Sequence, residues 1–247
     1  CALAHGRRHL DTARRALRWS AALLICVYLY SSVFSSTVFA ATISSANEEE
    51  KFIAGLNERR LFTLAQLHCQ KRLAEQDLDP AQRVDLTIAL CRTYAEHALH
   101  TPRERRDALW DAAAKTVVDF HRLSPRDPRT VLVDMQLALT TLARGELARQ
   151  ESELGAPGAP SQAEARGQLD AAIDQLKEVG EQVETQLRTA GRGGDAAMSE
   201  TELLSLQRNV RYQTARALRN QALCYPADSA ERSDSLLQAL EMRAPIT

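Results

Sequence analysis

The sequence predicts an all-α protein in which antiparallel helix pairs stack as an irregular α-solenoid behind an N-terminal hydrophobic helix. Three observations predict this class. The chain of 247 residues is 45% hydrophobic but only 5% aromatic, and it is dominated by Ala, Leu, Arg, Gln and Glu, which favour helices over strands. Potential helix caps recur along it, and the apolar residues between them follow helical spacing. The formal net charge of -1 argues against a nucleic-acid partner.

Residues 1–41 have the layout of an export signal. Five arginines between Arg7 and Arg18 precede the uncharged run Trp19–Ala41, and the small residues around Ala40 suit cleavage by a signal peptidase. The run is also long enough to be a single transmembrane anchor with the arginines on the cytoplasmic side. A buried helix is the third alternative. Under the first two, the rest of the chain is exported, either periplasmic or membrane-anchored, and touches the membrane only through this segment.

The remaining chain contains six clear helix starts. Asp79-Pro80, Thr101-Pro102 and Asp127-Pro128 each place a capping residue before a proline, which suits the first helical position. Three further starts have the spacing of a capping box, at Ser161, Ser199 and, more loosely, Asp228. With a first helix beginning near Glu48, the predicted helices are 48–76, 80–98, 102–122, 128–153, 161–189, 199–223 and 229–243.

A loop rich in Gly and Pro at 155–160 is the best predicted boundary. It separates a first helical repeat region, 42–154, from a second, 161–247. The chain starts at Cys1 and stops soon after a predicted helix, so we expect the second region to be truncated.

Apolar stripes predict how the first two helices of the repeat region pack. In the second helix the apolar residues occupy more than one face, which predicts neighbours on two sides. In the first helix we expect one stripe to be buried between helices. Its members are Leu56, Leu61, Leu64, Ala65, Leu67 and Leu73.

One segment resembles a tetratricopeptide repeat. Ala113, Val117, Phe120 and Pro125 have the relative spacing of the small, apolar, apolar and proline positions in the second helix of that repeat, and Asp127-Pro128 follows. A second segment, from Ala215 to Pro226, matches the pattern with its proline displaced by one residue. The spacings between predicted caps run from about 22 to 38 residues, whereas the family's whole helix pair takes about 34. The resemblance implies a helical repeat with a protein-binding role and identifies no ligand-contacting residue.

Cysteine and histidine are the candidates for chemistry. Three cysteines, Cys69, Cys91 and Cys224, follow the N-terminal segment. An antiparallel helix pair could bring Cys69 and Cys91 close enough for a disulfide. We favour the alternative that all three cysteines are small buried core residues. Three of the histidines, His68, His97 and His100, form a weak metal-ligand pattern with Cys69, although adjacent residues on a helix point in different directions. His121 fits the negative end of a helix dipole. We therefore predict no metal and no cofactor.

No catalytic motif is present. The sequence contains no Gly-x-Ser-x-Gly, phosphate loop, His-Glu-x-x-His or Cys-x-x-Cys, and the basic cluster Arg103–Arg106 includes an acid and lacks nearby aromatics, which is typical of a solvated helix face. We expect a non-enzymatic scaffold of the bacterial cell envelope that binds a protein or peptide. The alternative is a helical accessory region of a larger enzyme or of a transport or secretion component whose active part lies beyond residue 247.

Overall fold

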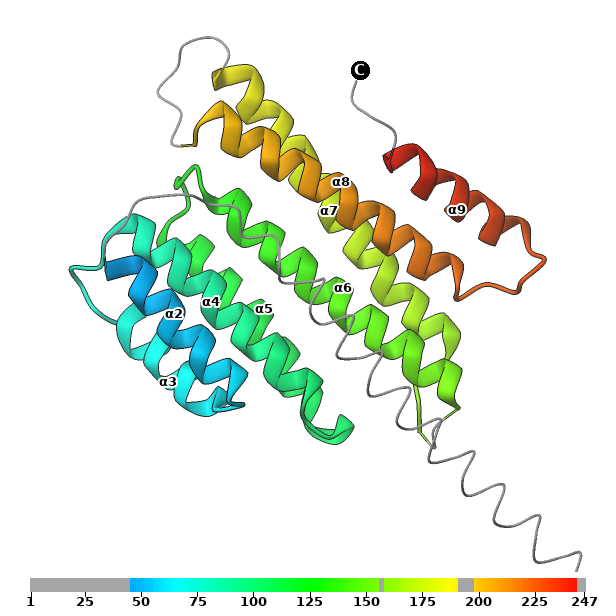
Figure 1. The fold of residues 1–247 in the computed structure, drawn as a ribbon, viewed down its shortest axis with the longest axis horizontal. Coiled ribbons are helices and arrows are strands. Elements are labelled where there is room, and N and C mark those ends of the chain that lie inside the picture. Colours follow the sequence, from blue (N-terminus) through cyan, green and yellow to red (C-terminus); the bar gives the residue numbers. More distant parts are fainter. Residues whose placement is uncertain (1–44, 156–157, 191–197, 244–247) are drawn as a thin grey trace, which may run out of the picture. The chain divides into compact units, whose positions relative to one another are not determined.

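The computed structural model describes residues 45–155, 158–190 and 198–243. These residues form helices and no strand, and adjacent helices pack on one another (Figure 1), so the predicted all-α class is confirmed. The elements are α2 (Ser45–Glu58), α3 (Phe62–Leu73), α4 (Pro80–Leu99), the short 3-10 helix η1 (Arg103–Arg105), α5 (Arg106–Leu123), α6 (Thr130–Leu154), α7 (Gln162–Ala190), α8 (Glu200–Ala222) and α9 (Ala230–Arg243).

The predicted export segment, Trp19–Ala41, lies outside the described residues. Within the described residues, no helix combines the length and the apolar character that a membrane crossing requires.

The described helices pack as a series. Helices α2 and α3 contact each other, and both contact α4. Helix α4 also contacts α5 and α6. From α6 onward each helix packs on the next, and the series ends with α9 on α8 (Figure 1). The helices from α6 to α8 alternate in direction, since Gln186 near the end of α7 donates to the Pro128 carbonyl before α6, and Gln221 near the end of α8 donates to Asp170 near the start of α7. The loop at 155–160 therefore joins two helices that pack together, and it lies inside one compact unit, Ile43–Thr247.

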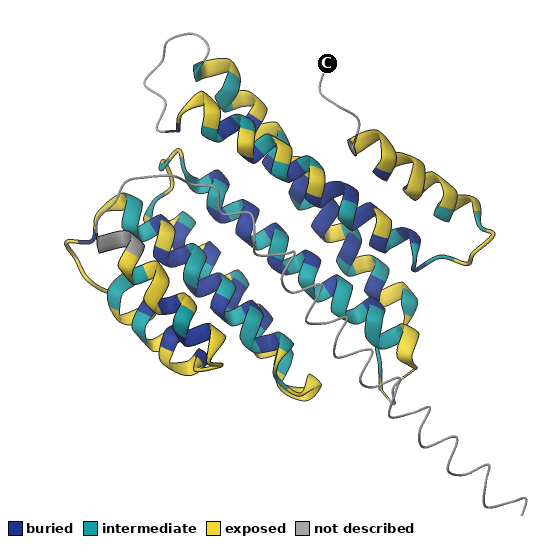
Figure 2. Ribbon diagram, in the orientation of Figure 1, coloured by how far each residue is buried: buried dark blue, intermediate teal, exposed yellow. Residues whose placement is uncertain are grey.

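Buried residues lie mainly on the sides of the helices that face neighbouring helices (Figure 2), and apolar clusters join successive helices. The largest cluster runs from Val131 of α6 through α7 and α8 to Ala239 of α9. Smaller clusters join α2 and α3 to α4, and α4 to α5 and α6. As predicted, α4 buries residues on more than one side, because Leu86 and Leu90 belong to the α2–α3 cluster while Val84 and Cys91 belong to the α5–α6 cluster.

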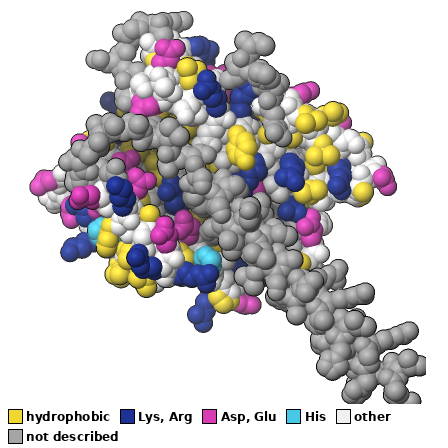
Figure 3. Space-filling view, in the orientation of Figure 1, with side chains coloured by type: hydrophobic (Ala, Val, Ile, Leu, Met, Phe, Trp, Pro, Cys, Tyr) yellow, Lys and Arg dark blue, Asp and Glu magenta, His cyan; other side chains and the backbone are white. Residues whose placement is uncertain are grey.

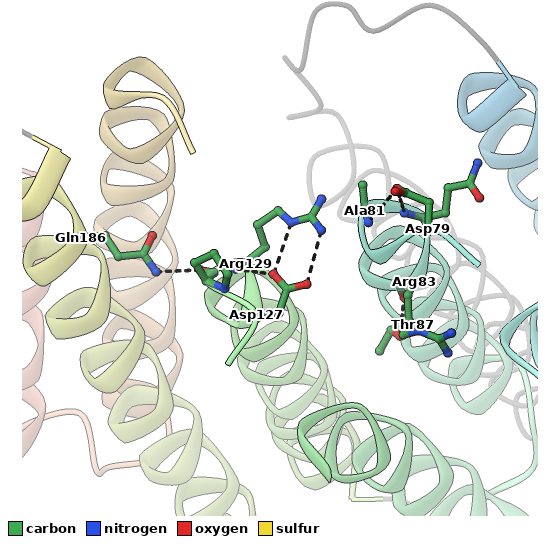
Figure 4. A network of polar contacts seen from close by, with 9 residues as sticks. Asp79, Ala81, Arg83, Thr87, Asp127, Arg129 and Gln186 are labelled. Atoms are coloured by element: carbon green, nitrogen blue, oxygen red, sulfur yellow. Dashed lines mark hydrogen bonds and ion pairs between the residues drawn. The ribbon is translucent and has the colours of Figure 1, made fainter. Parts of the chain in front are cut away.

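Three of the predicted caps form as expected. The Asp79 carboxylate accepts hydrogen bonds from the backbone N–H groups of Ala81 and Gln82 at 2.9 and 3.3 Å (Figure 4). Ser161 and Ser199 each form a full capping box, in which the serine Oγ accepts the N–H of the glutamate three residues on and that carboxylate accepts the serine N–H. These bonds satisfy donors that the first helical turn leaves without a partner.

The other three predicted caps are wrong in detail. Thr101 donates its hydroxyl to the His97 carbonyl of the preceding helix, and η1 occupies the turn before α5. Asp127 accepts the N–H and the guanidinium of Arg129 (Figure 4), and α6 begins only at Thr130. The start of α9 is capped by Ser229, whose Oγ accepts the N–H of Arg232, rather than by Asp228.

The predicted helix 48–76 is wrong, because the chain turns between α2 and α3. Arg60 adopts a left-handed conformation with φ of 58°. Its N–H bonds to the Asn57 carbonyl and the Leu61 N–H bonds to the Leu56 carbonyl, which is the hydrogen-bond pattern of a Schellman C-cap. Because α3 starts afresh after this turn, it packs through Phe62, Ala65 and Cys69, and the predicted stripe is split. Leu56 and Ala65 are buried, Leu73 is half-buried, and Leu61, Leu64 and Leu67 are exposed.

Candidate functional site

An open groove lies where the start of α3 meets the end of α4, η1 and the start of α5. Its volume is about 570 Å³. Its lining residues come from the turn after α2, the start of α3, the end of α4, η1 and the start of α5. None of its lining residues is acidic: Arg60, Phe62, His97, His100, Thr101, Pro102, Arg105, Ala108 and Leu109.

Three rings form the floor of this groove. The Phe62 ring stacks on the His97 ring, with centroids 5.1 Å apart, and on the His100 ring, with centroids 5.5 Å apart. Phe62 is buried, so its position is fixed by the α3–α4 contact. Gln66, one turn further along α3, lies 3.0 Å from His97 Nδ1 and fixes that ring as well.

The floor favours neutral imidazoles. Burial lowers the pKa of His97, and burial together with the nearby Arg60 guanidinium and His97 lowers the pKa of His100. The positive charge of the groove therefore comes from Arg60 and Arg105, which are exposed. Neither arginine forms an ion pair with another residue of the described part of the chain.

Arg60 is held in an unusual backbone conformation at this rim. A left-handed conformation costs a non-glycine residue roughly 1–2 kcal/mol, and glycine is the usual residue at this position of a C-cap. Strained residues of this kind cluster at functional sites. The combination of a strained arginine, a second arginine and an aromatic floor makes this groove the candidate binding site.

The three cysteines are small buried residues, as favoured from the sequence, and the alternative disulfide between Cys69 and Cys91 is not formed. Cys69, Cys91 and Cys224 are free and buried. Cys91 Sγ lies 3.5 Å from the Thr140 hydroxyl of α6, and burial raises the pKa of Cys69 to about 12 and that of Cys91 to about 11. These thiols act as small core residues and are poor nucleophiles.

The structure separates the histidines that the sequence placed in one pattern. His68 lies 3.0 Å from a Glu49 oxygen and against the Phe52 ring, away from the groove that holds His97 and His100. His121 pairs with Asp134 of α6 at 2.7 Å and so joins α5 to α6. Among the described residues, no group of three or more ligating side chains could hold a metal ion.

A buried polar cluster between α6 and α8 is the other concentration of charge. Arg216 donates two hydrogen bonds to the Glu146 carboxylate, at 2.7 and 2.5 Å, and Asn220 donates a third at 2.8 Å. Arg149, also buried, donates to the Asn220 amide oxygen at 3.0 Å. Burial raises the pKa of Glu146, although Arg216 opposes that effect. Because its members satisfy one another, we interpret this cluster as a structural clamp.

The sequence did not single out Arg60 or Phe62, because no motif marks an arginine in a C-cap. The basic cluster Arg103–Arg106 was noticed, and the structure divides it: Arg105 lines the groove, while Arg106 pairs with Glu151 and donates to the Thr101 carbonyl. Comparisons with models of protein families, with curated proteins and with solved structures found no match to the chain.

Proposed function

We propose that this protein is a non-enzymatic interaction scaffold that holds an acidic peptide segment of a partner protein in the groove beside Arg60. The observation that carries this proposal is that two exposed arginines, Arg60 and Arg105, line the same groove as the stacked rings of Phe62, His97 and His100. Guanidinium groups bind carboxylates in two-point geometry, and the rings offer an apolar surface to the rest of a peptide.

The hydrogen bonds of the lining favour binding over bond-breaking chemistry. The Thr101 hydroxyl donates to the His97 carbonyl at 2.7 Å, so it is not aligned with a base that could activate it. His97 Nδ1 faces the Gln66 amide, a group that cannot relay a proton as a carboxylate does.

The scaffold is proposed to be an open, irregular helical repeat similar to tetratricopeptide arrays. The serial packing from α2 to α9 supports this architecture, since each helix in a repeat array contacts mainly its neighbours. The groove then lies on one flank of the array, between the helix pair α2–α3 and the helix pair α4–α5.

The binding role is tested by Arg60→Gly. Glycine accepts the left-handed conformation, so this variant should melt at the same temperature as the parent or a few degrees higher, while losing one of the two guanidiniums. A photo-crosslinking residue at Ala108, which is exposed in the groove, should capture a partner protein in the cells that make this chain. Arg60→Gly should reduce that capture at least about tenfold, because the variant loses a hydrogen-bonded contact between a charged side chain and the partner.

Two controls make the result decisive. A photo-crosslinking residue at Ala171, exposed on α7 and remote from the groove, should not capture the same partner. Arg59→Gly removes the neighbouring exposed arginine and should leave capture at Ala108 unchanged. Capture that survives Arg60→Gly, or that is equal at both sites, would refute the proposal.

We further propose that the scaffold acts outside the cytoplasm in a bacterial cell envelope. The support is the order of charge in the sequence, with arginines before Trp19–Ala41 and Glu48-Glu49-Glu50 after it. A reporter enzyme that works only outside the cytoplasm, fused after Lys51, should be active. A well-expressed but silent fusion would contradict this location.

A further inference from the structure

The groove beside Arg60 contains two groups whose charge depends on pH. His97 and His100 lie three residues apart at the end of α4, and both line the groove. An ordinary imidazole takes up a proton near pH 6.5, whereas a guanidinium stays charged at every physiological pH. The lining therefore carries the charges of Arg60 and Arg105 at neutral pH, and in mild acid the charges of two imidazoliums are added to them.

The contacts of the two imidazoles suit their charged form as well as their neutral form. Both rings stack on Phe62, and the face of an aromatic ring attracts a cation. The Gln66 amide beside His97 Nδ1 has both a donor and an acceptor, so it can bond to this nitrogen with or without its proton. Protonation can therefore change the charge of the groove while its helices keep their places.

The acidic groups on the elements that pack around the end of α4 lie outside the groove lining. They are Glu58 of α2, Glu96 of α4 itself, Glu104 of η1, Asp107 of α5, and Glu146 and Glu151 of α6. Three of them are paired with arginines, Asp107 with Arg144, Glu146 with Arg216 and Glu151 with Arg106. Helix α3 contributes no carboxylate.

The remaining charged groups around the two histidines are basic. They are Arg59 and Arg60 in the turn after α2, Arg92 of α4, Arg103 and Arg105 of η1, Arg106 of α5 and Arg144 of α6. Figure 3 shows Lys and Arg interspersed with Asp and Glu on one face of the molecule. A groove with basic groups and no acidic one in its lining differs from that mixed surface, so each added proton increases a charge of a single sign.

We propose that this groove is regulated by pH, and that His97 and His100 make it bind its acidic partner more tightly in mild acid than at neutral pH. The inference rests on the proposed function, from which it takes the acidic peptide, and adds the condition under which the peptide is held. A bound carboxylate stabilises a nearby imidazolium and so raises the pKa of that histidine. Affinity should therefore rise as the pH falls through about 6.5 and level off once the free groove is protonated.

Calorimetric titration of residues 43–247 with hexaglutamate tests this inference. These residues form one compact unit with its own buried clusters. Lowering the pH from about 7.5 to about 5.5 at constant salt, a range in which glutamate side chains stay ionised, should tighten binding at least about tenfold if each histidine gains roughly one pKa unit. Binding near pH 6.5 should also take up protons, which is measured by repeating the titration in buffers of different ionisation enthalpy.

Substitutions locate the pH dependence. His97→Gln with His100→Gln should reduce the ratio of the two affinities to below about twofold, because glutamine does not titrate. If circular dichroism shows that this pair fails to fold, His100→Gln alone, at an exposed position, should still reduce the ratio. His121→Gln is the matched control, since His121 pairs with Asp134 outside the groove, and it should leave the ratio unchanged.

Glu96→Gln is a second control, because Glu96 lies next to His97 in the sequence and titrates in the same range, with a pKa raised by burial to about 7. Its carboxylate does not line the groove, so most of the pH dependence should remain in this variant. Loss of the pH dependence in Glu96→Gln would assign it to the carboxylate and overturn the role of the imidazoles.

The other contrary outcomes are equally distinct. An affinity for hexaglutamate that is the same at both pH values, but that Arg60→Gly weakens, removes the pH dependence and leaves the groove in place. A pH dependence that survives in the double histidine variant belongs to other groups. Hexaglutamate that binds at neither pH also overturns the inference. Photo-crosslinking at Ala108 then still decides whether the groove holds a partner, so the two failures are distinguishable.

Discussion

Gly145→Ala tests a close contact between α6 and α7. Gly145 lies in the middle of α6, where a β-carbon would come within 2.9 Å of Cγ and Cδ2 of Leu169 on α7 and within 3.1 Å of its backbone nitrogen. Leu169 is fully buried, so its side chain has no empty space to enter. The substitution must therefore move the backbones of α6 and α7 apart.

The expected effect combines two opposing contributions. Alanine in place of glycine inside a helix contributes about 1 kcal/mol of stability. Overpacking a filled core costs about 1–3 kcal/mol, and the upper part of that range applies here because the nearest atoms include backbone. We expect a net loss of about 1–2 kcal/mol in the free energy of unfolding.

Gly167→Ala is the matched control. Gly167 is an exposed residue of α7, and a β-carbon added there meets no atom within 4 Å. Only the helix propensity changes, so this variant should gain up to about 1 kcal/mol. Urea denaturation followed by circular dichroism at 222 nm measures both. If Gly145→Ala is as stable as Gly167→Ala, α6 and α7 do not approach as closely as the structure places them, and the reasoning fails.

Three further predictions concern charge and burial. Burial raises the pKa of Glu96 from 4.5 to about 7. Because the unfolded chain loses this proton at a lower pH than the folded chain, the free energy of unfolding should fall as the pH rises between those values, by up to about 3 kcal/mol. Glu96→Gln should remove this fall in urea titrations at several pH values. Arg216→Ala should lower the free energy of unfolding by about 3 kcal/mol, since it leaves Glu146 buried with fewer donors; a loss under 1 kcal/mol would contradict the clamp. Leu90→Asp should destabilise by several kcal/mol, whereas Leu61→Asp, at an exposed position, should melt with the parent.

The sequence predicted the helical class and most of the helices because local signals determine them. Capping boxes at Ser161 and Ser199 involve residues only three apart, so their chemistry can be seen in the sequence. The cap at Asp127 failed for a local and a tertiary reason. Its carboxylate accepts from Arg129, only two residues further on, whereas the next carbonyl, of Pro128, accepts from Gln186 of the distant helix α7. Contacts between distant segments are invisible in a pattern of neighbouring residues.

The candidate site could not be predicted because its defining feature is a backbone conformation. A Schellman cap ending in glycine marks a helix end in the sequence, but here Arg60 takes the left-handed position. Arginine favours helices elsewhere, so the pattern predicted one continuous helix through it. The turn also brings Phe62 onto His97 and His100, an arrangement that needs the α3–α4 contact and that no spacing within one helix could indicate.

The exposed leucines show why an apolar stripe is an ambiguous signal. Leu67 and Leu176 have the same chemistry and similar helical spacing, yet Leu67 is 58% exposed and Leu176 is fully buried. The difference is the position of the helix in the series, because a helix at the end has one flank without a neighbour. A stripe therefore predicts that one face of a helix is suited to burial, but it does not indicate whether the residues that bury it belong to the same chain.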